Sequence, residues 1–146
     1  MESSQLILDA SVVAKWFLRD EELLTTADAV RTDWEAGRWS LSAPGHLPFE
    51  VGNAILRAKR QSRLAERTAL EALAAFARLT EEISFQPPHL VVGGGTQLTD
   101  ALGVSFFDAC YLHVARLMGA SLITADAAFY RQTASQADVI WLGDYA

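Results

Sequence analysis

Short apolar runs alternate with longer amphipathic segments along almost the whole chain. The runs are continuous in apolar residues, as strands buried on both faces of a parallel sheet are. A strand, a helix and a second strand in succession form a right-handed crossover, which makes the two strands parallel. The sequence therefore predicts a three-layer α/β/α fold with a mainly parallel sheet of about five strands. The predicted strands are residues 5–9, 38–44, 83–88, 121–124 and 138–143.

Helical patterns fill most of the chain between these strands. They cover residues 11–18, 21–37, 46–60, 66–80, 105–119 and 126–134. The segment 89–104 is different, because it contains the run VVGGG and glycine is unfavourable inside a helix. We expect a loop or a frayed start there, followed by a short helix near 96–103. No linker or internal repeat interrupts the chain, and 146 residues suit a single domain, 1–146.

The composition excludes a membrane protein and a disulfide-stabilised one. No apolar run approaches the roughly 18 residues that a membrane span needs. Residues 1–13 lack the basic start and the cleavage site of a secretion signal. Cys110 is the single cysteine, which excludes an internal disulfide and is typical of a reducing cytosol. We therefore expect a cytoplasmic protein without a membrane partner, in which Cys110 packs in the core.

The positions of four acidic residues have two explanations, and the first is a separate local role for each residue. Asp9 and Asp126 each follow a predicted buried strand, where an aspartate commonly serves as a helix N-cap. Asp108 lies in the first turn of a predicted helix and has the capping-box spacing from Ser105. However, the residues that share its helix face are apolar, and a carboxylate among buried side chains is costly unless it is paired or binds a metal. Glu50 lies at the edge of an apolar stripe, as a solvated boundary residue does.

The second explanation is a common metal site. In open parallel sheets, ligands bind outside the carboxyl ends of the strands, at the point where the strand order reverses. If the strands of Asp9 and Asp126 are neighbours, Asp108 reaches the same crevice. Like charges so close raise one another's pKa values and destabilise the fold. A hard divalent cation such as Mg²⁺ or Mn²⁺ prefers oxygen ligands and removes that conflict.

Other catalytic patterns do not fit the sequence. The histidines His46, His89 and His113 lack zinc-site spacing such as HExxH, and the chain has no GxSxG nucleophile elbow. The run GGGTQ lacks the lysine of a P-loop. Receiver domains, which are also α/β proteins with clustered acids, open with paired acids after the first strand, whereas LILDAS has one.

Four short motifs resemble the acidic motifs of PIN-domain proteins. They are LILDASVVAKWF, HLPFEVGNAILRAKR, SFFDACYLHVA and SLITADAAF, and they span residue 6 to about residue 129. In length and order the chain is similar to the VapC toxins of toxin–antitoxin pairs. The run VVGGGTQ departs from the family, whose members more often continue a helix there. The resemblance implies a catalytic, metal-binding quartet of Asp9, Glu50, Asp108 and Asp126, supported by Ser11 and Thr124, with Asp9 and Asp108 as the most direct ligands.

The resemblance also implies a function and partners. It implies a Mg²⁺- or Mn²⁺-dependent endoribonuclease that hydrolyses RNA phosphodiesters with a metal-activated water. Such a toxin is held inactive by a cognate VapB-like antitoxin and forms a homodimer. The exposed aromatic surface for these contacts is expected near the first helices, at Trp16, Phe17, Trp34 and Trp39. The alternative is a catalytically weak binding module with the same fold that acts through protein or RNA contacts.

The net charge of −6 counts against an RNA-binding protein, because such proteins usually have a basic balance. Part of this negative charge belongs to the four acids, which one or two divalent ions would offset. The basic residues are also grouped, since Arg57, Lys59, Arg60, Arg63 and Arg67 lie close together in the sequence. They form either a surface for the RNA backbone or a solvated helix face.

Overall fold

A single parallel sheet forms the centre of the computed structural model, which describes residues 4–146. Its strands are β1 (Ser4–Leu8), β2 (Trp39–Pro44), β3 (Ser84–Gln86), β4 (Ser121–Thr124) and β5 (Val139–Trp141). They lie in the order β3-β2-β1-β4-β5, and every pair is parallel. The predicted fold class is therefore confirmed. The first three residues of the predicted domain 1–146 lie outside the described residues.

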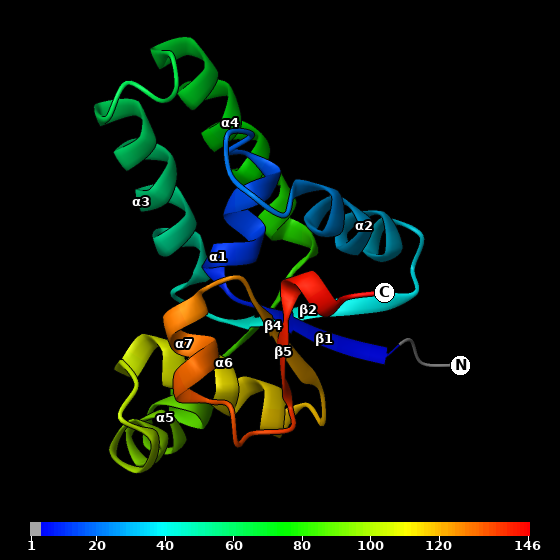
Figure 1. The fold of residues 1–146 in the computed structure, drawn as a ribbon, viewed down its shortest axis with the longest axis vertical. Helices are drawn as coiled ribbons and strands as arrows, with labels where there is room; N and C mark the ends of the chain where they lie inside the picture. Colours follow the sequence, from blue (N-terminus) through cyan, green and yellow to red (C-terminus); the bar gives the residue numbers. More distant parts are fainter. Residues whose placement is uncertain (1–3) are drawn as a thin grey trace.

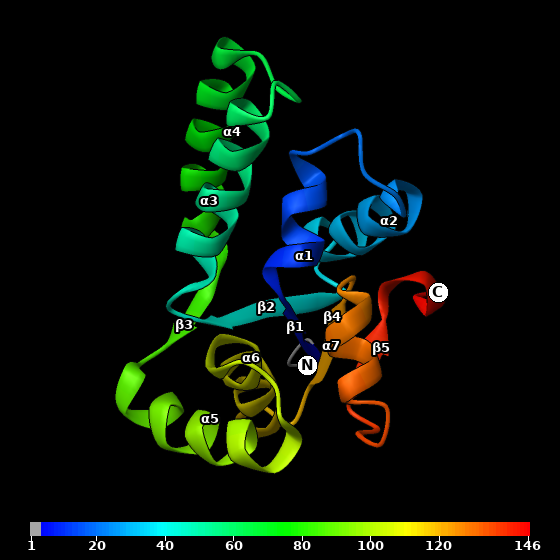
Figure 2. The same cartoon turned by 60° about the vertical axis from the view of Figure 1, so that its left-hand side comes forward.

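Helices cover both faces of the sheet. Helices α1 to α4 lie on one side and α5 and α6 lie on the other, which gives the three predicted layers (Figure 1). Helices α3 and α4 form a long hairpin that extends away from the sheet (Figure 2). The helices are α1 (Ala10–Val13), α2 (Leu24–Glu35), α3 (Leu47–Arg60), α4 (Glu66–Leu79), α5 (Pro88–Leu102), α6 (Phe106–Leu117) and α7 (Ala127–Gln132), with the 3₁₀ turns η1 (Ala14–Trp16), η2 (Thr80–Glu82) and η3 (Leu142–Asp144).

The strand order reverses at β1, which places two strand ends side by side. The chain passes from β1 outward to β2 and β3, and then crosses to β4 and β5 on the opposite side of β1. Leu8 at the end of β1 pairs with Ile123 of β4, and the Asp9 amide donates to the Ile123 carbonyl (3.4 Å). The strands of Asp9 and Asp126 are therefore neighbours, as the metal-site hypothesis requires.

The core consists of the apolar runs that predicted the strands. Ile7, Leu8, Leu122 and Ile123 are fully buried, because each central strand has helices on both faces. Cys110 is buried on α6, as expected. Within residues 4–146, no helix is both long enough and apolar enough to cross a lipid bilayer.

The early aromatic residues form an internal stack, so their predicted role as an exposed surface is wrong. The rings of Trp16 and Trp34 stack with centroids 5.8 Å apart, and Trp34 stacks on Trp39 at 6.1 Å. Trp16 and Trp39 are buried, and the indole of Trp16 donates to the Ala27 carbonyl (2.9 Å). These tryptophans fill the space between η1, α2 and the start of β2, and two of the three are buried.

Residues 88–102 form the continuous helix α5, whereas the sequence predicted a loop and a short helix there. Helix α5 packs mainly on α6, and its glycines allow close approach. A Cβ atom on Gly95 would lie 2.7 Å from Cys110 Sγ, closer than packed atoms can come. Tertiary packing therefore outweighs the low helix propensity of the glycine run. Pro88 begins the helix and Gly103, with φ of 69°, ends it.

This packing predicts opposite effects for two neighbouring glycines. Gly95→Ala should destabilise the protein by about 1–3 kcal/mol, because the added methyl group overpacks the contact with Cys110. Gly93→Ala should stabilise it by up to about 1 kcal/mol, because Gly93 is exposed and a Cβ there meets nothing within 4 Å. Urea denaturation of both variants measures the difference. Equal effects would show that α5 does not pack on α6 in this way.

Candidate functional site

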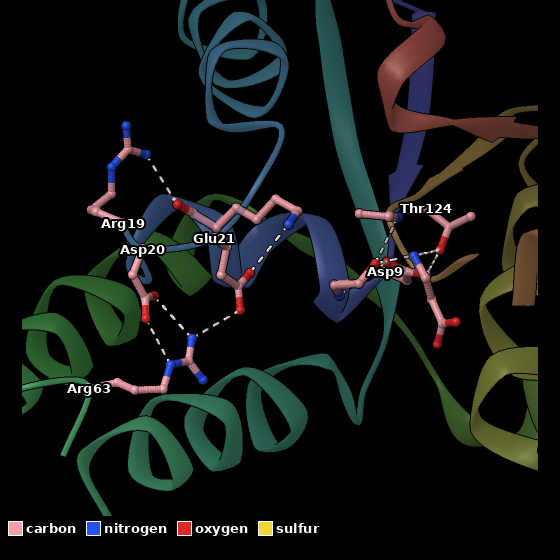
Figure 3. A network of polar contacts seen from close by, with 10 residues as sticks. Asp9, Arg19, Asp20, Glu21, Arg63 and Thr124 are labelled. Atoms are coloured by element: carbon pink, nitrogen blue, oxygen red, sulfur yellow. Dashed lines mark hydrogen bonds and ion pairs between the residues drawn. The ribbon is translucent and has the colours of Figure 1, made fainter. Parts of the chain in front are cut away.

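Asp9 is buried at the end of β1 and is fixed by two hydroxyl groups. Its side chain is the N-cap of α1, and Oδ1 accepts hydrogen bonds from the backbone amide of Ser11 (3.1 Å) and from Ser11 Oγ. Oδ2 accepts a hydrogen bond from Thr124 Oγ1, as Figure 3 shows for the labelled Asp9 and Thr124. Both hydroxyl groups also accept from the next strand end: Ser11 Oγ from the Ala125 amide (2.8 Å) and Thr124 Oγ1 from the Asp126 amide (3.0 Å). Ser11 and Thr124 thus link Asp9 to the segment that carries Asp126.

Asp126 and Asp108 both lie at helix starts that face this strand end. Asp126 is the N-cap of α7, where its Oδ1 accepts from the Phe129 amide (3.0 Å), and it is exposed. Asp108 lies in the first turn of α6, and its amide donates to Ser105 Oγ (3.2 Å). The capping explanations are therefore correct for Asp9, Asp108 and Asp126. They do not exclude a common site, because the helices that follow these strand ends begin at one edge of the sheet.

Glu50 reaches the same region from α3. The buried Tyr111 hydroxyl donates to Glu50 Oε1 (2.8 Å), and His46 Nε2 lies 3.2 Å from the same oxygen without the alignment of a hydrogen bond. Burial raises the pKa of the Tyr111 phenol well above its usual range, so the phenol remains a donor. Tyr111 is one of the residues that share the helix face of Asp108, which the sequence pattern describes as apolar. Its position one turn after Asp108 was the available signal for a role beside the acids.

The four acids are close enough to act on one another. Burial is the main reason that the pKa of Asp9 rises to about 7, and the charges of Asp108 and Asp126 add to the rise. Burial and the charge of Asp126 also raise the pKa of Asp108. Burial raises the pKa of Glu50, with a further contribution from Asp108. Asp108 therefore interacts electrostatically with each of the other three carboxylates.

Residues 6–134 match the family model described as the PIN domain. The chain belongs to the PIN domain family. The predicted resemblance is confirmed over most of the chain. None of the curated protein sequences matches it.

Solved structures similar to this PIN domain include toxins. The PAE2754 protein from Pyrobaculum aerophilum has a TM-score of 0.61 at 19% identity, over 98% of this chain and 93% of that one. The VapC20 toxin from Mycobacterium tuberculosis, which cleaves the sarcin–ricin loop, has a TM-score of 0.59 at 20% identity, over 86% and 93%. A toxin–antitoxin complex from Klebsiella pneumoniae gives 0.55 at 16% identity, over 92% and 95%. Identities this low show a common fold.

A cleft of about 450 Å³ opens beside two of the four acids of this PIN domain, and Asp9 and Asp108 do not line it. Of the predicted site residues, Ser11, Glu50 and Asp126 line it. One wall comes from α1, η1 and the segment up to Glu21, and the opposite wall comes from α3. Its volume lies within the range of sites that hold small ligands, so one part of an extended substrate fits next to the carboxylates.

Most of the grouped basic residues are neutralised by neighbouring acids. The ion pairs are Lys59–Glu66, Arg63–Asp20 and Arg67–Glu71. For Lys59, Arg63 and Arg67 the structure therefore favours a solvated helix face over a surface for the RNA backbone. In the part of the chain that is described, Arg57 and Arg60 have no carboxylate within 4 Å, and Arg57 lines the cleft.

The donor set of this PIN domain fits a hard divalent cation in chemistry and charge. The four acids offer only carboxylate oxygens, which Mg²⁺ and Mn²⁺ prefer. Burial, with a smaller contribution from neighbouring charges, raises the pKa values of Asp9, Asp108 and Glu50, so their charged forms are unfavourable, and a bound cation would offset this. Across residues 4–146, however, no three His, Cys, Asp or Glu side chains are grouped tightly enough to hold an ion as they stand. Binding would have to draw the carboxylates closer.

Proposed function

We propose that this PIN domain is a Mg²⁺- or Mn²⁺-dependent endoribonuclease and the toxin of a toxin–antitoxin pair. The observation that carries the proposal is the meeting of two strand ends, where the Ser11 and Thr124 hydroxyl groups link the buried Asp9 to the segment of Asp126. The charge of Asp108 acts on the carboxylates beside it. A cleft lined by Glu50 and Asp126 gives an extended substrate access to these two carboxylates. The similarity in fold to a VapC toxin and to a toxin–antitoxin complex supports the same function.

In this proposal each side chain has a defined part. A bound divalent ion activates water and stabilises negative charge on a phosphodiester. Asp9 and Asp108 would be its direct ligands, and Asp126 would complete the site. Ser11 and Thr124 donate to the two oxygens of Asp9 and so fix the orientation of its carboxylate.

Glu50 is suited to accept a proton. The Tyr111 hydroxyl donates a hydrogen bond to Glu50 Oε1, and no donor within residues 4–146 is paired with Oε2. The raised pKa of Glu50 makes Oε2 a stronger base than an ordinary carboxylate, which improves proton transfer near neutral pH. Glu50 is therefore the group that we assign to the attacking water.

The proposed partners are RNA, a VapB-like antitoxin and a second copy of the chain, in the cytoplasm. Most of the exposed large apolar residues lie on α3, α5 and α6 rather than near the first helices, and they include Phe49 (78% exposed), Phe107 (52%) and Val92 (50%). Exposed apolar patches commonly mark protein interfaces. We assign this patch to the homodimer, and a strictly monomeric mass in light scattering at micromolar concentration would contradict that assignment.

One observation favours the alternative, a binding module with weak catalysis. The described acids do not form a ready-made group of three metal ligands. A protein of this kind would bind RNA or protein without cutting RNA.

RNA digestion distinguishes the two functions. The purified protein should cleave total cellular RNA with Mg²⁺ or Mn²⁺ and lose that activity in EDTA, because ion and carboxylates act together. Expression without the antitoxin should arrest growth. RNA that is bound but intact with either ion would favour the binding module. Cleavage that persists in EDTA would reject the metal-dependent mechanism.

A further inference from the structure

The cleft beside the acids contains a lysine that the proposed chemistry does not use. Lys15, on η1, is 8% exposed, and its Nζ lies 3.3 Å from Glu21 Oε1. An ammonium group has three donors, and among residues 4–146 Glu21 is the one acid paired with it. A charge that is removed from water in this way is costly unless several partners satisfy it. The ammonium therefore has capacity for a second anion.

Lys15 lies on the same cleft wall as the predicted site. Ser11, Ala14, Lys15 and Leu18 follow one another along that wall. The opposite wall, on α3, carries Glu50 and, two turns further, Arg57. Seven helical residues span about 10 Å, so the basic end of the cleft lies about that far from Glu50. The cleft thus has an acidic end, where Ser11, Glu50 and Asp126 lie, and an end with Lys15, Arg57 and Glu21, where the cations outnumber the carboxylate.

Glu21 does not depend on Lys15 for its position. Arg63, from the turn between α3 and α4, lies 3.4 Å from Glu21 Oε2 through Nη2. The same guanidinium binds both oxygens of Asp20, at 2.8 and 3.0 Å. Figure 3 shows this group around Arg63 at the opposite side of the view from Asp9 and Thr124. If Lys15 turns to another anion, Glu21 still keeps a cationic partner.

We propose that Lys15 and Arg57 form a phosphate-binding subsite for RNA, with Glu21 as the counter-ion that an RNA phosphate displaces. The inference rests on the proposed function, since the acidic end of the same cleft takes the phosphodiester that is cut. Phosphates recur along an RNA strand, so a strand bound at the acidic end carries further phosphates along the cleft. Lys15 and Arg57 are the cleft residues with the charge to bind one of them.

RNA binding can be separated from cleavage in an inactive background. Fluorescence anisotropy with a short, mixed-sequence, single-stranded RNA is measured over a range of salt, with Asp9→Asn in every protein and EDTA in the buffer. Adding Lys15→Met should weaken binding on the order of tenfold and lower the salt slope by about one, because one phosphate contact is lost. Adding Glu21→Gln should tighten binding severalfold, because the competing carboxylate is neutral. Lys59→Met is the matched control, since Lys59 is paired with Glu66 outside the cleft and should leave both quantities unchanged.

Lys15→Met and Glu21→Gln are expected to change the RNA affinity in opposite directions, so the test does not depend on how well each variant folds. A damaged fold cannot bind RNA more tightly, so a gain with Glu21→Gln together with a loss for Lys15→Met supports the subsite. Lys15→Arg, which keeps the charge, should retain most of the affinity. Equal binding by the Lys15→Met and Lys59→Met proteins would overturn the proposal, as would a loss of affinity with Glu21→Gln. So would unchanged RNA binding with weaker binding of oligoglutamate, which would point to an acidic protein partner.

RNA binding and RNA cleavage together show whether the nuclease function or the phosphate-binding subsite is wrong. RNA binding that depends on Lys15, in a protein that never cleaves RNA, would reject the nuclease and keep the subsite. Cleavage by the Lys15→Met protein with the wild-type KM would reject the subsite and keep the nuclease.

Discussion

Asp9→Asn should lower the rate of metal-dependent RNA cleavage on the order of 10³-fold or more, which is about 4 kcal/mol of transition-state stabilisation. In the proposed function, the substitution removes a charged ligand from the place where the ion and the phosphodiester would meet. The hydrogen bonds from Ser11 and Thr124 fix the Asp9 carboxylate, so no neighbouring acid can take its place without rearrangement. Initial rates on total cellular RNA at saturating Mg²⁺ measure the effect.

The matched control for this result is Asp100→Asn. Asp100 is an exposed aspartate on α5, outside the cleft, so the Asp100→Asn protein should keep wild-type activity. Asp108→Asn should resemble Asp9→Asn, because Asp108 interacts with all the other acids. Glu50→Gln and Asp126→Asn should lose less, because in the proposed function neither residue is a direct ligand of the ion. Equal cleavage by wild type and the Asp9→Asn protein would mean that the activity belongs to another site or to a contaminant.

The sequence predicted the sheet and the candidate acids because their signals are local. Buried parallel strands are continuous apolar runs, and Asp9 and Asp126 directly follow two such runs. Whether these strands are neighbours is a property of strand order, which periodicity does not contain. The pairing of Leu8 with Ile123 supplied that information.

The features that the sequence did not predict depend on contacts between distant residues. The glycine run of α5 is helical because Gly95 packs against Cys110 on another helix. Arg63 looks like part of a free basic patch until its partner Asp20, more than forty residues earlier, is known. Tyr111 is an apolar-face residue by spacing, and only the fold brings its hydroxyl to Glu50. In each case a tertiary contact decides what a local pattern leaves open.

In EDTA, the stability of the wild-type protein should fall as the pH rises from about 4 to about 8, and Asp9→Asn should remove much of that fall. The pKa of Asp9 is about 7 in the folded protein, against an ordinary value of 3.8. Between these values the folded state binds more protons than the unfolded state, so the free energy of unfolding decreases with increasing pH. The full difference is on the order of 4 kcal/mol, or roughly 10 °C in thermal midpoint for a chain of this size.

Divalent ions should reverse this loss. A ligand that binds only the folded state raises the thermal midpoint, and Mg²⁺ or Mn²⁺ competes with protons for the carboxylates. The increase in midpoint should therefore be larger near pH 8 than near pH 5, and Asp9→Asn and Asp108→Asn should each remove most of it. Differential scanning fluorimetry of wild type, both variants and Asp100→Asn, with and without millimolar Mg²⁺, measures these shifts. If wild type and the Asp9→Asn protein follow the same pH dependence in EDTA, and millimolar Mg²⁺ leaves the wild-type midpoint unchanged, Asp9 is neither a buried acid of raised pKa nor a metal ligand.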